Sequence, residues 1–341
     1  MSGKKFLVTL SSKELSDWAV SRHFPAYRAR QIYGHIFEHL LAGPEQMNNI
    51  PKDVKAALAE DFYAPSSRVE EIIPSGQGVE KLRLSLFDGD CVEVAVIPAL
   101  ERVTLCLSTQ VGCPVGCRFC ASGAAGFVRN LTAGEIIEEF LAGCARVGRK
   151  CDNIVFMGIG EGLLNADNLF AALMILTERF GMSPRRITVS TSGYVPGILR
   201  FAQLGREYNL AISLHAPDDE TRAKLIPDHV RYPIDEILAA AETWREKSGR
   251  IYTLEYTVIA GINDSPLQGK ALGRLAFAHH AKINLIPYNP TQSGYSRPAP
   301  EAIENFEKAI LSTGAMVTRR VERGRGGSAA CGQLRANSIR R

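Results

Sequence analysis

The sequence predicts an α/β protein: a partial (β/α)6-type barrel, with a helical segment before it and a small β-hairpin between the two. The first observation is the repeated order of strand, loop and helix from residue 103 onward, which indicates a parallel sheet covered by helices. The second is a helical period within residues 1–65, and the third is a two-residue alternation within residues 66–100. A count near six strand–helix units favours a partial barrel over a complete eight-fold one.

Residues 1–65 are expected to form a helical accessory domain. Apolar residues such as Ile32 recur near the 3.6-residue period between positions 28 and 41, which predicts an amphipathic helix. Pro44, after a glycine, ends that helix, and a second helix is expected over 51–59.

Residues 66–100 are expected to form a β-hairpin extension. Apolar and polar residues alternate over 82–86 and again over 92–96, as in strands with one buried face. The dipeptide Asp88-Gly89 lies between the two runs and is a typical turn.

Residues 101–322 are assigned to the barrel, and residues 323–341 to a C-terminal segment. Thr132 and Glu135 match a capping box, so a helix is expected to begin at 133. The ligand sites of such sheets lie at the carboxyl ends of the strands. The expected strands are 103–109, 153–158, 186–192, 209–215, 252–259, 282–287 and 315–321. The expected helices are 133–147, 167–180, 196–206, 234–247, 266–280 and 300–313.

Composition describes an ordinary globular protein of 341 residues, with 45% hydrophobic and 22% charged residues. No signal peptide and no apolar run of about 20 residues is present, so we expect a cytoplasmic location and no membrane contact. A reducing compartment also fits eight cysteines that do not suggest a secreted disulfide scaffold. The net charge of +4 is uninformative, but residues 318–341 carry seven arginines. That segment is either a phosphate-binding tail or a solvated one.

Three cysteines in one short loop, Cys113, Cys117 and Cys120, follow the spacing C-x3-C-x2-C. Three thiolates suit an iron–sulfur cluster, whereas a structural zinc site needs four protein ligands. With three ligands, one iron of a four-iron cluster stays open to a small molecule. That is the arrangement of radical SAM enzymes, in which S-adenosylmethionine (SAM) binds the fourth iron. The glycines and proline of the loop argue against three buried core cysteines.

Several expected strands end in glycine or polar residues. The strand 153–157 runs into a glycine-rich loop in which glycines let the backbone approach a ligand and Glu161 could pair with an ammonium group. Ser213, His215 and Asn289 follow other strands. A lone histidine is more often a satisfied core residue, but with its neighbours at the barrel mouth this one is expected to line a cofactor pocket.

Beyond these single features, the chain resembles the RlmN/Cfr family of radical SAM RNA methyltransferases from about residue 80 to 335. The N-terminal run 27–32 resembles, more loosely, the RNA-binding accessory domain of that family. The expected fold is accordingly a radical SAM barrel. The motifs that carry the resemblance are Thr104–Cys113, Gly126–Leu131, Ser190–Gly193, Ile212–Ala216, Ile283–Pro287 and Ala329–Leu334.

The resemblance implies a reaction that uses two SAM molecules. Cys331 would first accept a methyl group from one SAM. A 5′-deoxyadenosyl radical, made by reductive cleavage of a second SAM at the cluster, would remove hydrogen from that methyl group, and the resulting carbon radical would add to an adenine carbon. Glu93 would take the proton from that carbon, and Cys106 would attack Cys331 to release the product as a disulfide forms.

The resemblance also implies the cofactor ligands. Cys113, Cys117 and Cys120 would hold a [4Fe-4S] cluster. The SAM-binding residues would be Gly160, Glu161, Ser190, Ser213, Leu214, His215 and Asn289. One departure is Gly162, because the family loop usually has proline after the glutamate; its loss removes a restriction on φ.

The residue chemistry agrees with these roles. Adenine carbons 2 and 8 are electron-poor, so a radical route is expected in place of polar methyl transfer. The adduct holds the substrate covalently, and thiolate exchange by a second cysteine would free it. A carboxylate on a hairpin strand is usually solvent-facing, so the role of Glu93 depends on the resemblance.

The leading hypothesis is methylation of carbon 2 of an adenosine in 23S rRNA, with tRNA as a second candidate substrate. Cfr-type methylation at carbon 8 is the alternative within the family. Two alternatives come from other classes of protein. One is a radical SAM enzyme that acts on a protein or a small molecule, which would leave Cys106 and Cys331 without a role. The other is a non-catalytic RNA-binding protein whose three cysteines hold zinc, which would be colourless, whereas a [4Fe-4S] protein is brown. The expected partners are RNA, contacted by basic groups such as Arg28, Arg30 and Lys52, and an electron donor such as flavodoxin or ferredoxin; a monomer is expected.

Overall fold

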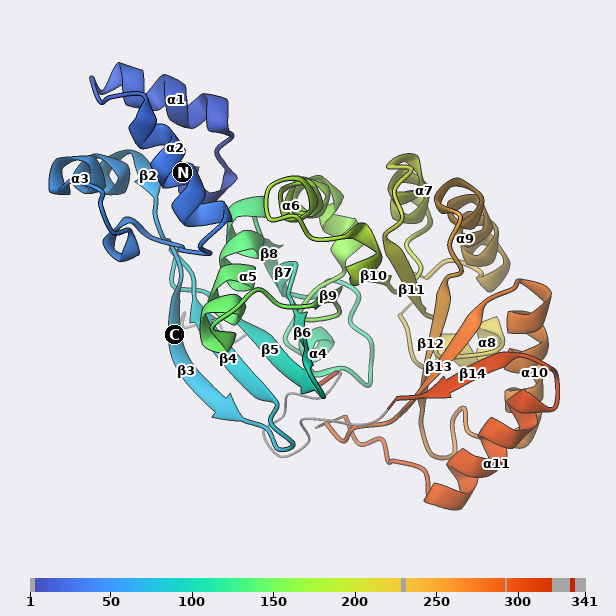
Figure 1. Cartoon of the computed structure of the whole chain (residues 1–341). Coiled ribbons are helices and arrows are strands. Elements are labelled where there is room, and N and C mark those ends of the chain that lie inside the picture. The colour runs from blue at the N-terminus through green and yellow to red at the C-terminus, as the bar shows by residue number, and fades with distance from the viewer. Residues whose placement is uncertain (1–3, 228–230, 292, 321–331, 335–341) are drawn as a thin grey trace.

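A computed structural model describes residues 4–227, 231–291, 293–320 and 332–334. The centre of the molecule is a ten-stranded mixed sheet in the order β14-β13-β12-β11-β10-β9-β6-β5-β4-β3 (Figure 1). From β6 to β14 every neighbouring pair is parallel, and the sheet curves into a partial barrel with its helices outside. This confirms the predicted fold class.

The parallel strands agree with the predicted ones to within a few residues. All of them except β14 carry at least two buried apolar residues. The strands are β6 (Arg102–Cys106), β9 (Asn153–Phe156), β10 (Ile187–Thr191), β11 (Asn209–Ser213), β12 (Thr253–Val258), β13 (Lys282–Pro287) and β14 (Met316–Arg319).

The barrel helices also form where the hydrophobic period predicts them. The predicted capping box is present, because the hydroxyl of Thr132 accepts from the N–H of Glu135 while the Glu135 carboxylate accepts from the N–H of Thr132. The helices are α5 (Ala133–Val147), α6 (Ala166–Glu178), α7 (Val195–Gln203), α9 (Ile234–Ser248), α10 (Pro266–Ala278) and α11 (Pro300–Leu311).

The segment expected to be a hairpin contains three strands: β3 (Arg68–Pro74), β4 (Glu80–Ser85) and β5 (Cys91–Ala99). The turn lies at Asp88-Gly89 as predicted. β5 pairs antiparallel with β6, so these three strands are not a separate hairpin. They extend the barrel sheet at its β6 edge.

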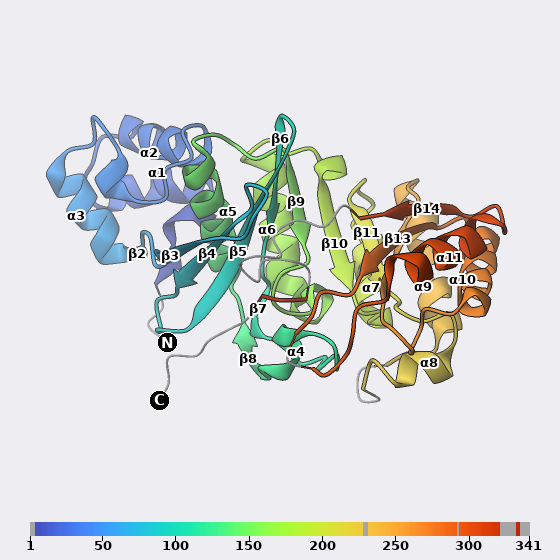
Figure 2. The same ribbon diagram turned by 90° about the horizontal axis from the view of Figure 1, so that it is seen from below.

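The N-terminal helices lie beyond β3 and α5, at the opposite end of the molecule from α10 and α11 (Figure 2). The helices are α1 (Ser12–Ser21), α2 (Tyr27–Phe37) and α3 (Lys52–Asp61). They contact the barrel through the rings of Phe37 and Phe180, whose centroids are 4.9 Å apart, and through a 2.7 Å bond from Arg179 Nη1 to the carbonyl of Thr9.

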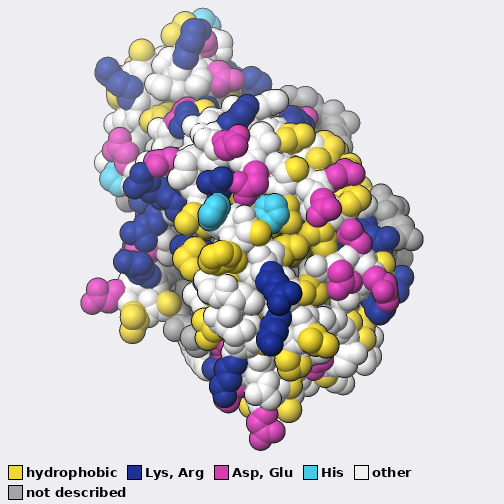
Figure 3. Space-filling view, turned by 90° about the vertical axis from the view of Figure 1, so that its right-hand side faces the viewer, with side chains coloured by type: hydrophobic (Ala, Val, Ile, Leu, Met, Phe, Trp, Pro, Cys, Tyr) yellow, Lys and Arg dark blue, Asp and Glu magenta, His cyan; other side chains and the backbone are white. Residues whose placement is uncertain are grey.

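Shorter elements complete the fold. They are β1 (Lys5–Phe6), β2 (Phe62–Tyr63), β7 (Gln110–Gly112), β8 (Phe127–Asn130), α4 (Ala121–Ala124), α8 (Asp219–Ala223) and the 3-10 turns η1 (Leu7–Thr9), η2 (Pro44–Gln46), η3 (Gly162–Asn165) and η4 (Pro184–Arg186). Across the described residues, none of the helices combines the length and apolar character that a membrane crossing needs. The surface on the α10 and α11 side mixes charged and apolar side chains (Figure 3).

Candidate active site

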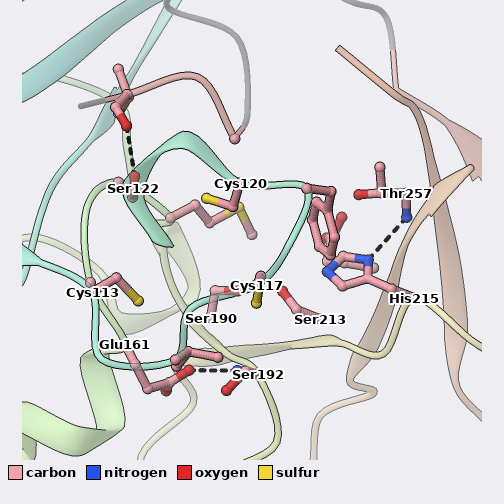
Figure 4. A pocket seen from close by; sticks show the side chains of 18 of the residues that line it. Cys113, Cys117, Cys120, Ser122, Glu161, Ser190, Ser192, Ser213, His215 and Thr257 are labelled. Atoms are coloured by element: carbon pink, nitrogen blue, oxygen red, sulfur yellow. Dashed lines mark hydrogen bonds between the residues drawn. The ribbon is translucent and has the colours of Figure 1, made fainter. Parts of the chain in front are cut away.

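A cavity opens at the carboxyl ends of the parallel strands, where sequence reasoning expects the site. The cysteine loop after β7 covers one side of it, and residues of β9 to β13 or just after them, together with Gly332 and Leu334, form the other walls (Figure 4). The predicted residues on its wall are Cys113, Cys117, Cys120, Gly160, Glu161, Ser190, Ser213, His215 and Asn289.

The cysteine loop is held by backbone contacts that its glycines permit. Gly112 has a φ of +74°, and a Cβ there would lie 1.8 Å from the carbonyl oxygen of Gly126. That carbonyl accepts the N–H of Cys113 at 2.9 Å. Farther along, the carbonyl of Leu225 accepts the N–H of Arg118 at 3.0 Å. The loop is therefore fixed on two sides, and its three thiols line one cavity wall.

Two of these thiols, those of Cys113 and Cys117, are in a setting that favours their neutral form. Burial raises the pKa of Cys113 to about 12 and raises that of Cys117 well above its usual range. Metal ions must therefore displace these protons to bind.

The donor set fits a four-iron cluster, in which each thiolate binds a different iron. In the described part of the chain, no three His, Cys, Asp or Glu side chains lie close enough together to hold a single metal ion. Cys113, Cys117 and Cys120 would hold the cluster.

The loop after β9 presents Glu161 to the cavity. Its carboxylate accepts the N–H of Ser192 at 2.6 Å and that of Leu163 at 3.3 Å. Burial raises the pKa of Glu161, although these N–H groups lower it in part. The backbone N–H of Glu161 donates to Gln110 Oε1 at 2.8 Å, so the loop is tied to β7 beside the cysteines.

Gly160 is a position at which this loop has no room for a side chain. Its φ is +108°, and a Cβ would lie 2.7 Å from Gln110 Cβ and 2.8 Å from Thr109 Oγ1. We expect Gly160→Ala to weaken SAM binding at least about tenfold, because strain of roughly 1–3 kcal/mol must be relieved by moving the loop. Equilibrium dialysis of SAM measures this. Gly205→Ala is the control, since Gly205 has a φ of +58° and nothing within 4 Å; equal effects of both variants would contradict the prediction.

His215 is buried at the end of β11 and is held in a left-handed conformation, with a φ of +58°. Its Nδ1 accepts the N–H of Thr257 at 3.0 Å, which leaves the proton of the neutral ring on Nε2 as a donor. Burial, with a contribution from Arg222, lowers the pKa of His215 to about 3. His215 is thus a neutral donor rather than a cation. Ser213 and Asn289 line the same cavity, whereas Leu214 is buried and is not part of the cavity wall.

The lowered pKa of His215 predicts a loss of stability in mild acid. The unfolded chain binds a proton below the ordinary pKa of 6.5, and the folded chain does not until about 3, so the free energy of unfolding falls as pH drops through this window. Asn tolerates a left-handed backbone and offers an acceptor to Thr257. Between pH 6.5 and 5, wild type should lose about 1–2 kcal/mol more than His215→Asn in urea unfolding. Equal losses would show that His215 does not titrate this way.

A second group of predicted residues lies on β5 and β6, next to the cavity. Cys106 is buried against Ala95, Ile159 and Leu334, and Leu334 also lines the cavity. Glu93 is buried two residues before Ala95, which pairs with Cys106, so Glu93 and Cys106 share one face of the sheet.

The described C-terminal residues are anchored at the same place. The carbonyl of Gly332 accepts the N–H of Ala121 at 2.9 Å, and the carbonyl of Leu334 accepts the hydroxyl of Ser122 at 2.7 Å (Figure 4). Cys331, predicted to carry the methyl group, lies outside the described residues; Gly332, which follows it, lines the cavity.

Sequence reasoning missed two charged residues of the site. Glu255 lines the cavity from β12, and Lys81 on β4 makes an ion pair with Glu93. The available signal for Glu255 was a lone carboxylate inside an apolar parallel strand, which such strands rarely carry unless it has a use. Lys81 gave no comparable signal, because its strand alternates as a half-exposed one would.

Comparison with known proteins agrees with the geometry. Residues 107–269 match the model of the radical SAM superfamily, which implies SAM and a [4Fe-4S] cluster as cofactors. A probable dual-specificity RNA methyltransferase RlmN of Akkermansia muciniphila is 40% identical, over 96% of this chain and 95% of its own length. Its counterpart in Thermotoga neapolitana is 39% identical, over 97% of both chains.

A solved structure gives the same result. The crystal structure of a radical SAM methyltransferase from Sphaerobacter thermophilus superimposes with a TM-score of 0.92 at 39% identity, over 97% of this chain and 99% of that one. The chain therefore belongs to the RlmN family of radical SAM RNA methyltransferases.

Proposed function

We propose that this protein methylates carbon 2 of an adenosine in 23S rRNA, with tRNA as a second substrate, through a methyl group carried on Cys331. The observation that carries the proposal is the packing of Cys106 against Leu334 at the edge of the thiol-lined cavity. Cys106 thus lies against a residue that follows Cys331 by three positions in the chain. An enzyme that transferred a methyl group directly from SAM would have no use for this contact.

We assign cofactor binding to the residues that line the cavity. Cys113, Cys117 and Cys120 would hold a [4Fe-4S] cluster, which supplies the electron that cleaves SAM. Glu161, buried at the cavity wall, offers its carboxylate to the ammonium group of SAM. His215 offers a neutral N–H donor, and Ser190, Ser213 and Asn289 offer further polar groups. The apolar wall formed by Phe119, Ile286 and Tyr288 excludes water from the reacting atoms.

The residues on β5 and β6 complete the reaction. Once the methylene carbon on Cys331 is bonded to adenine, Glu93 takes the proton from the ring carbon. The electron left over from the radical adduct returns to the one-electron carrier that supplied it. The Cys106 thiolate then attacks the sulfur of Cys331, so that the sulfur–carbon bond breaks, a disulfide forms, and the released carbon takes up a proton to become the methyl group. That disulfide must be reduced before the next turnover.

RNA binding is assigned to basic groups at the N-terminal domain. Arg30 and Lys52 are exposed there, and phosphate contacts by such groups make affinity depend on salt. The target adenosine must leave its stack to enter the barrel mouth, at a cost of a few kcal/mol. An acidic one-electron carrier such as flavodoxin or ferredoxin is the proposed reductant.

The test is mass spectrometry of nucleosides from ribosomal RNA and from tRNA, each incubated with reconstituted protein, SAM and a reductant. The proposal expects 2-methyladenosine in both RNAs. 8-methyladenosine would assign the protein to the Cfr-type reaction. 5′-Deoxyadenosine without any methyladenosine would contradict an RNA substrate.

A further inference from the structure

A buried ion pair joins Lys81 to Glu93. Lys81 Nζ lies 2.9 Å from Glu93 Oε1, and the two side chains are only 8% and 7% exposed. Two charges taken out of water lose several kcal/mol of hydration each, and apolar residues of similar size often stabilise a fold as well or better. A contribution to the stability of the fold is therefore a poor explanation for this buried ion pair.

The strand register places this pair beside the second cysteine. Lys81 is opposite Ala95 on β5, and Ala95 is opposite Cys106 on β6. Directly opposed residues point to the same face, as do residues two apart on one strand. Lys81, Glu93 and Cys106 thus share a face, and in the row from Lys81 to Cys106 the intervening side chain is the single methyl group of Ala95.

The opposite face of these strands is ordinary core. Leu82 and Leu84 of β4, and Val92 and Val94 of β5, are fully buried there. The strands could bury apolar residues on both faces, yet the face toward Cys106 carries a cation and an anion. A second cation, Arg83, is directly opposite Glu93 in register, and it makes ion pairs with Glu70 and Glu71 at 4.0 and 3.9 Å.

We propose that Lys81 is a positioning residue for proton removal: its ammonium group holds the Glu93 carboxylate in place on the face that carries Cys106. The inference rests on the proposed function, in which Glu93 takes a proton from adenine. In that step the ring C–H bond breaks, the proton moves to a carboxylate oxygen, and the electron pair stays in the ring. Without the ammonium group the carboxylate loses the cation that lies 2.9 Å from its Oε1 and fixes its position on this face.

The experiment compares Lys81→Met, Lys81→Arg and Glu93→Gln in the full-length reconstituted enzyme with labelled RNA. Denaturing gels detect RNA covalently held by protein, and chromatography quantifies 5′-deoxyadenosine and methyladenosine. We expect Lys81→Met to behave like Glu93→Gln: 5′-deoxyadenosine forms as in wild type during the first turnover, the covalent adduct accumulates, and methyladenosine falls about 10²–10⁴-fold. Lys81→Arg, which keeps the charge, should recover activity to within about tenfold of wild type.

Glu80→Gln is the matched control. Glu80 neighbours Lys81 on the same strand, and its ion pair with Arg146 is exposed, so breaking that pair should change neither adduct nor product.

Three results would overturn the inference. Lys81→Met with wild-type product and no adduct would show that Glu93 acts without it. Loss of iron and of 5′-deoxyadenosine in Lys81→Met would show that Lys81 is needed to keep the protein folded and its cluster in place, and not specifically to position Glu93. Lys81→Arg as inactive as Lys81→Met would show that the charge is not what matters. Wild-type product from Glu93→Gln would instead refute the assignment of Glu93 in the proposed function, whatever Lys81 does.

Discussion

Cys117→Ser is expected to give a colourless protein that forms no 5′-deoxyadenosine and lowers methylation by at least about 10⁴-fold. The thiol of Cys117 lines the cavity beside Cys113 and Cys120, and a serine hydroxyl is a poor ligand for iron in such a cluster. With two thiolates left, the cluster should not survive purification. Iron analysis and the visible absorption spectrum of anaerobically reconstituted protein measure the loss.

Cys144→Ala provides the control for that variant. Cys144 is buried in α5 and its environment includes Cys151, away from the cavity wall. Its iron content and product yield should match wild type. A Cys117→Ser protein that keeps a full complement of iron would contradict the assignment of this loop as the cluster site.

Cys106→Ala is expected to stop the reaction after the RNA has become bonded to the protein. Without the thiolate that attacks Cys331, the product cannot leave, so methyladenosine should fall by on the order of 10⁴-fold. RNA should instead remain attached to protein through denaturing electrophoresis. SAM cleavage in the first turnover should be unchanged, since Cys106 is not on the wall of the cofactor cavity.

Cys91→Ala is the matched control, because Cys91 is another buried cysteine of the same sheet, at the start of β5. It should release product normally. If Cys106→Ala also releases product at the wild-type rate, no thiol exchange involving Cys106 takes part in the reaction.

The parallel strands could be predicted because each combines an apolar run with glycine or polar residues at its end. The helix α5 begins at Ala133 as expected, since a capping box is a local signal that tertiary packing does not override. β3 could not be identified as a separate strand in this way. Its side chains are mostly exposed, so the alternation that marks a half-buried strand is weak.

The pairing between β5 and β6 could not be predicted from the sequence either. The two strands follow one another along the chain, but alternation alone does not say whether a hairpin joins a larger sheet. The same limit applies to Glu93 and Lys81. On a half-buried strand a charged residue reads as solvent-facing, and only the folded structure shows that both are buried and paired.

The cavity residues were easier to predict, for a topological reason. The carboxyl ends of parallel strands meet at one edge of the sheet, so polar residues after different strands converge. Ser213, His215 and Asn289 do so. Leu214 does not, because successive residues of an extended chain point to opposite faces, and its side chain is buried in the core.

In the proposed reaction the methyl group passes through a protein cysteine and loses a hydrogen atom on the way. A labelling experiment tests this with SAM whose methyl group carries three deuterium atoms and with protein whose cysteine has been methylated from the same SAM. We expect methyladenosine that retains two of the three deuterium atoms, with the third found in 5′-deoxyadenosine. Methyladenosine that retains all three would mean direct transfer from SAM and would contradict the proposed reaction.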